Sequence, residues 1–249
     1  MPTALDYLKR IGHAGSIEPT AEVLRALHRA HMLSVPFENL DIGLKRDIPC
    51  DAEAAVRKIV ARRRGGFCYE MNGGFAWLLR QLGFEVTMLA ARVSRSDGSL
   101  GPGFDHLTLR VDLAEPWLAD VGFGDSFVEP LRLVSGLEQV EGSARYRLSE
   151  TVAGMQLEKS QSEDWRVEYA FTLQPRELSD FAGMCHYHQT SPESHFTRNC
   201  ICSRALPDGR ITLSGMKLIT TRGGKREERA LASEEEWRET LRREFGVEL

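Results

Sequence analysis

The sequence has 249 residues and 42% apolar side chains, enough to fill the core of one large domain or of two to three small ones. Its formal net charge of −4, from 32 basic and 36 acidic residues, argues against a dedicated nucleic-acid-binding protein and against electrostatic attachment to anionic membranes. No apolar run approaches the ~20 residues that a membrane-spanning helix needs, and the N-terminus lacks the apolar stretch of a signal peptide.

The first third of the chain predicts four helices, because apolar residues recur there at helical spacing. The first carries Leu5, Leu8 and Ile11 on one face. Capping residues and helix breakers mark the ends: Thr3 and Gly12 for the first helix, Pro19 and Pro36 for the second, Asp51 for the third, and Cys68 and Gly83 for the fourth.

The middle of the chain changes to the pattern of β-strands. Residues 84–93, 106–111 and 117–123 are strand candidates separated by turns rich in glycine and proline, and 145–148, 165–170 and 171–173 are shorter ones. This stretch therefore predicts a mostly antiparallel sheet.

The last part is mixed. Residues 210–213 and 217–221 predict a hairpin, the charged run 225–229 is interpreted as a solvated loop, and Ser233 begins a capping box ahead of a final helix.

The most informative segment places a cysteine after two glycines and at the start of a helix: Arg64-Gly65-Gly66-Phe67-Cys68. Unpaired N–H groups and the helix dipole favour an anion there, so we expect a lowered thiol pKa and a nucleophilic thiolate at Cys68. The alternative is a small buried apolar residue, as most free cysteines are. The five cysteines are irregularly spaced and odd in number, which favours a reducing, cytoplasmic location.

A thiol nucleophile needs a base, and the base needs an orienting group. His106 begins an alternating strand after a glycine-rich loop, and Asp120 lies among apolar residues in the next strand. A hairpin loop of residues 113–116 would place the two on opposite faces. A loop of residues 112–116 would pair Val111 with Trp117 and place them diagonally on one face, within reach of each other. Both registers remain open. Taken separately, His106 is more simply explained as a buried core histidine and Asp120 as a turn or cap residue.

Five segments of the sequence carry a resemblance to a known family: residues 35–41, 64–75 around the cysteine, the two strand segments 106–111 and 120–124, and 191–196. Together they resemble the arylamine N-acetyltransferase family, in family order and over most of the chain. The resemblance implies a triad of Cys68, His106 and Asp120, with acetyl-CoA as co-substrate and an arylamine, arylhydrazine or N-hydroxyarylamine as acceptor. No permanently bound cofactor is expected, and no metal either, because the spacing of the cysteines and histidines between residues 185 and 202 matches no common zinc pattern.

The resemblance also implies an α+β fold. It consists of a helical bundle with the cysteine (residues 1–84), an antiparallel β-barrel with the histidine and aspartate (85–190), and an α/β lid (191–249). The first two parts would share the core of papain-like cysteine enzymes.

Candidate pocket residues follow from the flat, apolar shape of an arylamine, which favours aromatic walls. Phe37, Phe123 and Phe196 lie in or beside the matching segments, and Gly103 and Gly124 are candidate coenzyme contacts. Two other interpretations remain: a thiol hydrolase or amidase with the same triad, and a non-catalytic member that binds a small aromatic ligand or a partner protein. The oligomeric state stays open.

Overall fold

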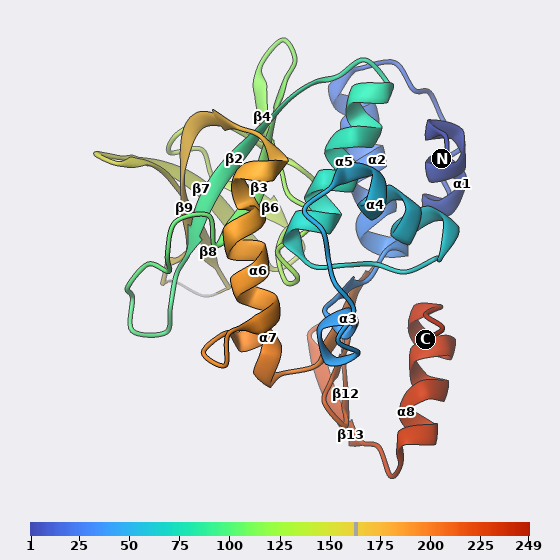
Figure 1. Ribbon diagram of the computed structural model, residues 1–249. Coiled ribbons are helices and arrows are strands. Elements are labelled where there is room, and N and C mark those ends of the chain that lie inside the picture. Colours follow the sequence, from blue (N-terminus) through green and yellow to red (C-terminus); the bar gives the residue numbers. More distant parts are fainter. Residues whose placement is uncertain (162–163) are drawn as a thin grey trace.

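The N-terminal part of the protein is a group of helices packed against one side of a large sheet (Figure 1). The computed structural model describes residues 1–161 and 164–249. The helices of this part are α1 (Ala4–Ile11), α2 (Ala21–Ser34), α3 (Leu40–Gly43), α4 (Ala52–Val56), which continues into the π-helix η1 (Arg57–Ala61), and α5 (Cys68–Gln81).

Most helix ends agree with the capping signals. Thr3 forms a capping box with Asp6, and Gly12 ends α1 in the left-handed conformation that favours glycine. Two details of the prediction are wrong. Pro19 precedes α2, whose cap is Thr20, and Leu5 is exposed because Tyr7 takes its place on the buried face.

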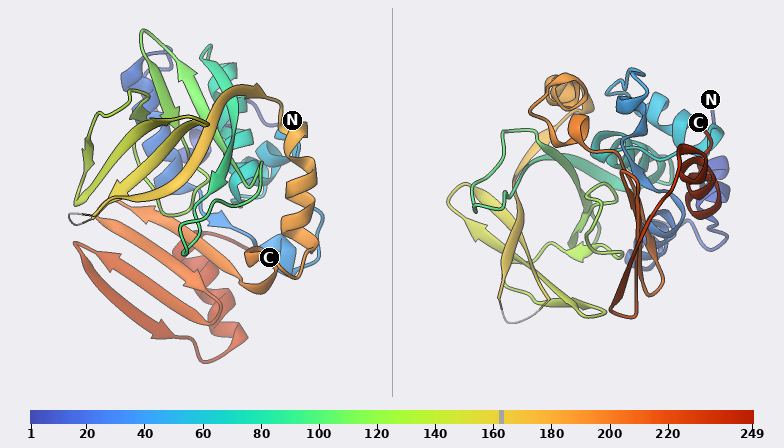
Figure 2. Two further views of the ribbon diagram at one scale, coloured as in Figure 1. Left: turned by 90° about the vertical axis from the view of Figure 1, so that its left-hand side faces the viewer. Right: turned by 90° about the horizontal axis from the view of Figure 1, so that it is seen from below.

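The central sheet has eight antiparallel strands and curls into a nearly closed barrel (Figure 2). Its spatial order is β5-β4-β3-β2-β9-β8-β7-β6. The strands are β2 (Glu85–Val93), β3 (His106–Asp112), β4 (Pro116–Ala119), β5 (Leu131–Arg132), β6 (Gln139–Glu141), β7 (Ala144–Thr151), β8 (Gly154–Ser160) and β9 (Arg166–Arg176).

A side chain joins the two edge strands of this sheet. The backbone N–H of Arg132 on β5 donates to Oε1 of Gln139 on β6 at 2.8 Å, and the Gln139 amide donates back to the Arg132 carbonyl at 3.0 Å. The amide thus takes the place of a neighbouring strand, and it satisfies backbone groups that an open edge would leave unpaired.

The chain leaves the barrel through the 3₁₀ helix η2 (Leu178–Phe181), α6 (Ala182–Thr190) and α7 (His195–Arg198). It then forms a second antiparallel sheet in the order β1-β10-β11-β12-β13, which lies beside the barrel (Figure 2). Its members are β1 (Phe37–Glu38), β10 (Ile201–Leu206), β11 (Gly209–Ser214), β12 (Lys217–Arg222) and β13 (Lys225–Ala230), and α8 (Glu234–Thr240) with the π-helix η3 (Leu241–Phe245) follows.

Two predictions from the sequence are wrong in this region and in the barrel, and some elements were missed. The strand expected over residues 117–123 ends at Ala119, because the chain turns away where Asp120 is bonded by other elements. The charged run 225–229 is not a loop but lies in the exposed edge strand β13. Helix α6 and strands β8 and β10 were not predicted at all. The fold is therefore mixed α/β, with the barrel expected from the sequence and a second sheet to which the N-terminal part contributes β1.

Candidate active site

Cys68 is the first residue of α5 and is buried, with 3% of its surface exposed. The start of α5 lies against the start of β3, since the Tyr69 hydroxyl donates to the Phe104 carbonyl at 2.8 Å. The backbone N–H of Leu107, the residue after His106, hydrogen-bonds the Cys68 sulfur. Cys68 thus lies against the start of the strand that carries His106.

The environment of the thiol differs from the expectation of a lowered pKa. Burial raises the pKa of Cys68 well above its ordinary value, and the Leu107 N–H offsets this only in part. Arg64 supplies no compensating charge because Glu38 and Asp41 engage its guanidinium. A thiolate here therefore depends on a base close enough to take the proton within the buried site.

His106 and Asp120 form a buried pair, with 2.6 Å between Nε2 and Oδ2. Val111 pairs with Trp117, and the turn is only residues 113–115 because Asp112 and Pro116 pair as well. This is the register that places His106 and Asp120 on one face. Burial alone would raise the pKa of Asp120, but the His106 charge and hydrogen bonds from His106, Asn72 and Gly122 hold it below its usual value.

Asn72 connects helix α5 to strand β3 and to the segment that follows β4. Its amide donates to Asp120 Oδ1 at 2.9 Å and to the Leu107 carbonyl at 2.6 Å, and its Oδ1 accepts the Val121 N–H at 2.9 Å. Asn72 lies one helical turn after Cys68, so it faces the same side of α5. That spacing is the signal in the sequence that identifies it.

Phe123 and Tyr169 cover His106. The Phe123 ring lies edge-on to the imidazole at 5.2 Å between centroids, and the Tyr169 ring lies 5.1 Å from each of them. The Tyr169 hydroxyl lies 3.3 Å from Oγ1 of Thr108, inside the barrel. Phe123 is therefore at the site as expected, whereas Tyr169, far along the chain, gave no signal.

Phe37 and Phe196 lie together on another side of Cys68. Their rings are 6.1 Å apart, and Phe196 also contacts the ring of Phe67, the residue before Cys68, at 5.7 Å. Gly124 adopts a φ of 90° and faces the Phe37 ring. Phe37 and Gly124 line a small cavity of about 10 Å³, together with residues of α2, α5, β10 and β11.

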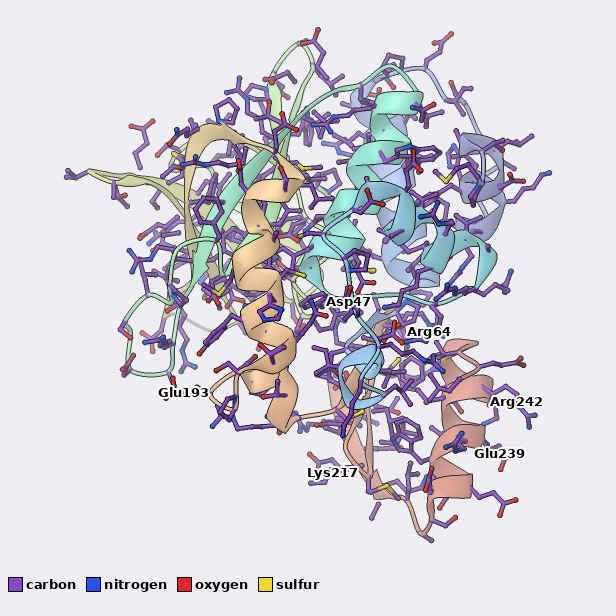
Figure 3. The ribbon with its side chains drawn as sticks, viewed as in Figure 1. Asp47, Arg64, Glu193, Lys217, Glu239 and Arg242 are labelled. Carbon is purple, nitrogen blue, oxygen red and sulfur yellow. The ribbon has the colours of Figure 1, made fainter. Side chains whose placement is uncertain are left out.

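A cluster of buried charges supports the start of α5, and we name it the acid–base cluster: Glu38, Asp41, Lys58, Arg64 and Glu70. Lys58 Nζ lies 2.8 Å from both Asp41 Oδ2 and Glu70 Oε1, and the Arg64 Nε–Glu38 Oε1 distance is 2.9 Å. Glu38 and Arg64 thus form a buried ion pair. Figure 3 labels Arg64 beside α3, the helix that carries Asp41.

Glu70 joins the acid–base cluster to the cysteine. Its Oε2 accepts the N–H of Phe67, the residue that precedes Cys68, at 3.2 Å. The cluster holds three carboxylates and two buried cations, and the exposed Arg46 adds a third cation, 3.6 Å from Oδ1 of Asp41. Burial, only partly offset by Lys58, raises the pKa of Glu70 to about 7.

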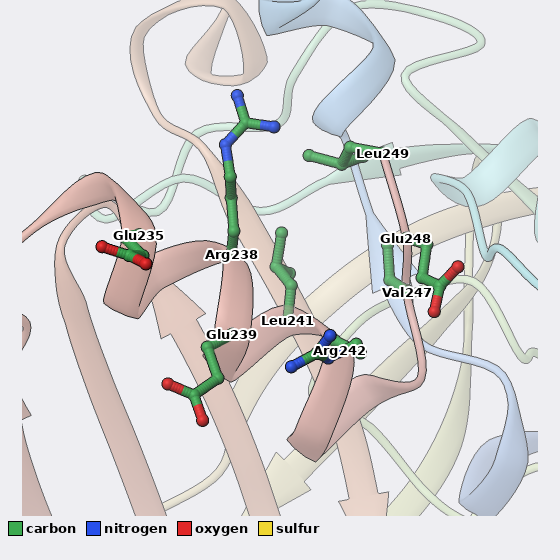
Figure 4. A pocket seen from close by; sticks show the side chains of 8 residues that line it. All are labelled: Glu235, Arg238, Glu239, Leu241, Arg242, Val247, Glu248 and Leu249. Carbon is green, nitrogen blue, oxygen red and sulfur yellow. The ribbon is translucent and has the colours of Figure 1, made fainter.

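The remaining candidate, Gly103, lies exposed in the loop before His106, and no atom stands within 4 Å of the position that a Cβ would occupy. A groove of about 470 Å³ lies elsewhere, along α8 and the C-terminus, and none of the predicted residues lines it (Figure 4). Within residues 1–161 and 164–249, no group of three or more histidine, cysteine or acidic residues is placed to hold a metal ion.

Comparison with known proteins identifies the class of protein. Residues 20–249 match the family model described as N-acetyltransferase. A 36% identical relative over 250 residues, covering 99% of this chain and 89% of its own length, is the arylamine N-acetyltransferase of Escherichia coli K12. Another, from Salmonella typhimurium and named arylamine N-acetyltransferase / N-hydroxyarylamine O-acetyltransferase, is 40% identical over 79% of this chain and 71% of its own. The chain belongs to the arylamine N-acetyltransferase family.

Solved structures agree with this assignment. The Salmonella typhimurium arylamine N-acetyltransferase superposes with a TM-score of 0.93 at 35% identity, over 99% of this chain and 92% of that one. The Mycobacterium marinum enzyme in complex with CoA gives 0.91 at 34% identity, over 98% and 93%. The prediction of an acyltransferase of this family is thus confirmed. None of the helices in the described part of the chain has the length and apolar character needed to cross a membrane.

Proposed function

We propose that the protein transfers an acetyl group from acetyl-CoA to an arylamine, arylhydrazine or N-hydroxyarylamine through an acetyl thioester on Cys68. The observation that carries this proposal is the buried His106–Asp120 pair at 2.6 Å, beside the helix that Cys68 begins. Family membership supports the reaction, and a CoA complex is known for the Mycobacterium marinum relative.

The first half-reaction acetylates Cys68. Asp120 holds Nε2 of His106, which leaves Nδ1 free to take the thiol proton. The thiolate attacks the thioester carbonyl, and the backbone N–H of Cys68 is a candidate donor to the oxyanion that forms. The bond from the acetyl carbon to the CoA sulfur then breaks, and the proton on His106 passes to that sulfur.

The second half-reaction transfers the acetyl group to the amine. The amine nitrogen attacks the Cys68 thioester, His106 takes the proton that the nitrogen loses, and the bond to the Cys68 sulfur breaks. Asp120 stabilises the imidazolium, and amide formation makes the step favourable. Phe37, Phe123 and Phe196 would provide the aromatic walls of the acceptor site, and Gly103 and Gly124 would contact the coenzyme.

The division at residues 84/85 and 190/191, with a lid and a papain-like core, belongs to the same proposal. Its support is that the cysteine begins a helix while the histidine and aspartate come from adjacent barrel strands and their ends. The cytoplasmic location also stays a prediction from the cysteine content.

Intact-protein mass spectrometry tests the proposal. After acetyl-CoA is added, the wild-type protein should gain one acetyl group and lose it when an arylamine is supplied, while Cys68→Ser should gain none. Cys50→Ser, at a half-buried cysteine, is the matched control and should be acetylated normally.

Two outcomes would contradict it. Loss of the acetyl group at the same rate without an amine would identify a hydrolase instead. Double-reciprocal plots against acetyl-CoA at several arylamine concentrations should be parallel, and intersecting lines would mean direct transfer without an acetyl-enzyme.

A further inference from the structure

The segment of residues 120–128, between β4 and β5, carries much of the candidate site but has no regular secondary structure. We name it the 120–128 loop. Asp120 is its first residue, Phe123 covers His106, and Gly124 faces Phe37. Because no strand ladder fixes this backbone, its shape depends on hydrogen bonds from other elements.

One side chain holds both ends of the loop. Nε2 of His28, on α2, accepts the backbone N–H of Asp120 at 3.0 Å, and its Nδ1 lies 2.7 Å from the carbonyl oxygen of Val128. His28 is fully buried, with its ring stacked on Phe127 at 5.6 Å and edge-on to Phe75 at 5.8 Å.

The two backbone partners determine the tautomer of His28. A peptide N–H can only donate and a carbonyl oxygen can only accept, so Nε2 is the unprotonated nitrogen and Nδ1 carries the hydrogen. Burial lowers the pKa of His28 to about 4, so the ring is neutral near pH 7 and can accept and donate at once.

Other side chains also hydrogen-bond the ends of the loop, but each of them holds only one end. Asn72 Oδ1 accepts the N–H of Val121, and the Glu141 carboxylate accepts the N–H of Val128 at 2.8 Å. His28 hydrogen-bonds both ends, and it therefore fixes the distance between Asp120 and Val128.

We propose that His28 is a positioning residue of the active site: it holds Asp120 at one end of the 120–128 loop and Val128 at the other, and so positions Asp120 for His106 and Phe123, which the loop carries between its ends, for the acceptor. This inference rests on the proposed function of the triad. It goes beyond that function by assigning a role to a residue that touches neither the substrate nor His106.

The first test needs no variant. Nitrogen-15 NMR of the imidazoles should show His28 as the neutral Nδ1–H tautomer at pH 7. An Nε2–H tautomer, or an imidazolium at pH 6, would overturn the inference, because neither can accept the Asp120 N–H.

The second test separates the two hydrogen bonds. His28→Asn retains a donor near the Nδ1 position but loses the acceptor for Asp120, so acetylation of Cys68 should slow by about 10-fold or more as the triad shifts. His28→Gln retains an acceptor near Nε2 but releases Val128, so it should raise the KM for the arylamine more than it slows acetylation.

His31 provides a matched control on the same helix. It is also buried, its Nε2 lies 2.9 Å from the Tyr7 hydroxyl, and none of its hydrogen bonds reaches the loop. His31→Gln should lower Tm without changing either half-reaction. Equal slowing of both half-reactions by the two His28 variants would overturn the positioning role. Absence of acetylation in the wild-type protein would instead overturn the proposed function, whatever the tautomer of His28.

Discussion

Replacement of Asp120 by asparagine tests charge and orientation separately from size. The carboxylate accepts hydrogen bonds from His106 at 2.6 Å, from Asn72 at 2.9 Å and from the Gly122 N–H at 3.0 Å. An asparagine has only one oxygen for these donors. If its oxygen faces Asn72 and Gly122, its NH₂ group faces Nε2 of His106 and favours the tautomer with hydrogen on Nδ1, which cannot take the thiol proton.

The opposite orientation of the amide points its NH₂ group at Asn72 and Gly122, which leaves buried donors facing each other. An unpaired buried donor costs about 1–3 kcal/mol of stability. In the analogous serine triad the same substitution lowers the rate about 10⁴-fold. Since a thiol needs less help from its base than a hydroxyl does, we expect at least about 10²-fold slower acetylation of Cys68, or about 3 kcal/mol.

The assay is single-turnover acetylation followed by mass spectrometry, together with circular dichroism and a melting curve. Asp112→Asn, at the half-exposed far end of β3, is the matched control and should acetylate within about threefold of wild type. Because folding lowers the pKa of Asp120, the charged group stabilises the protein above its unfolded pKa near 4, and this advantage over Asp120→Asn should disappear as the pH falls. A well-folded Asp120→Asn protein with near-normal acetylation would remove Asp120 from the triad.

Three further predictions concern the structure around Cys68. Lys58→Met should destabilise the protein by about 3–5 kcal/mol in urea, because it leaves three buried carboxylates with Arg64 as their buried cation and removes the cation that contacts Glu70, whereas the exposed Lys9→Met should change little. Folding raises the pKa of Glu70 to about 7, so the folded state binds its proton more tightly. Wild-type stability relative to Glu70→Gln should therefore fall as pH rises from about 5 to 8, and a difference independent of pH would refute the raised pKa of Glu70. Gly122→Ala should abolish acetylation, because its Cβ would lie 2.9 Å from Cα of Cys68, whereas Gly103→Ala should fold with an unchanged Tm.

Local signals in the sequence predicted the elements that carry the site. The glycines before Cys68 and the apolar spacing after it gave α5, and alternation gave β3. The register of the hairpin could not be predicted, because it depends on whether Trp117 pairs with Val111 or with Asp112, and the sequence is compatible with either loop length.

The rest of the site depends on contacts between distant parts of the chain. His28 lies 92 residues before Asp120, and Tyr169 lies 61 residues after Thr108, so no local pattern marks either as part of the site. The thiol pKa was predicted in the wrong direction for a related reason. The helix terminus is visible in the sequence, but the burial of Cys68 and the diversion of Arg64 to Glu38 and Asp41 are not.

The charged strand β13 has a consequence for the behaviour of the protein in concentrated solution. It is the free edge of the second sheet, and each residue from Lys225 to Ala230 is exposed. An unpaired edge is a template on which a strand of another molecule can add, which leads to aggregation. Five of its six side chains carry a charge of one sign or the other, so an incoming apolar strand would have to strip them of water. The same residues that made this segment look like a loop therefore keep the sheet from growing from one molecule to the next.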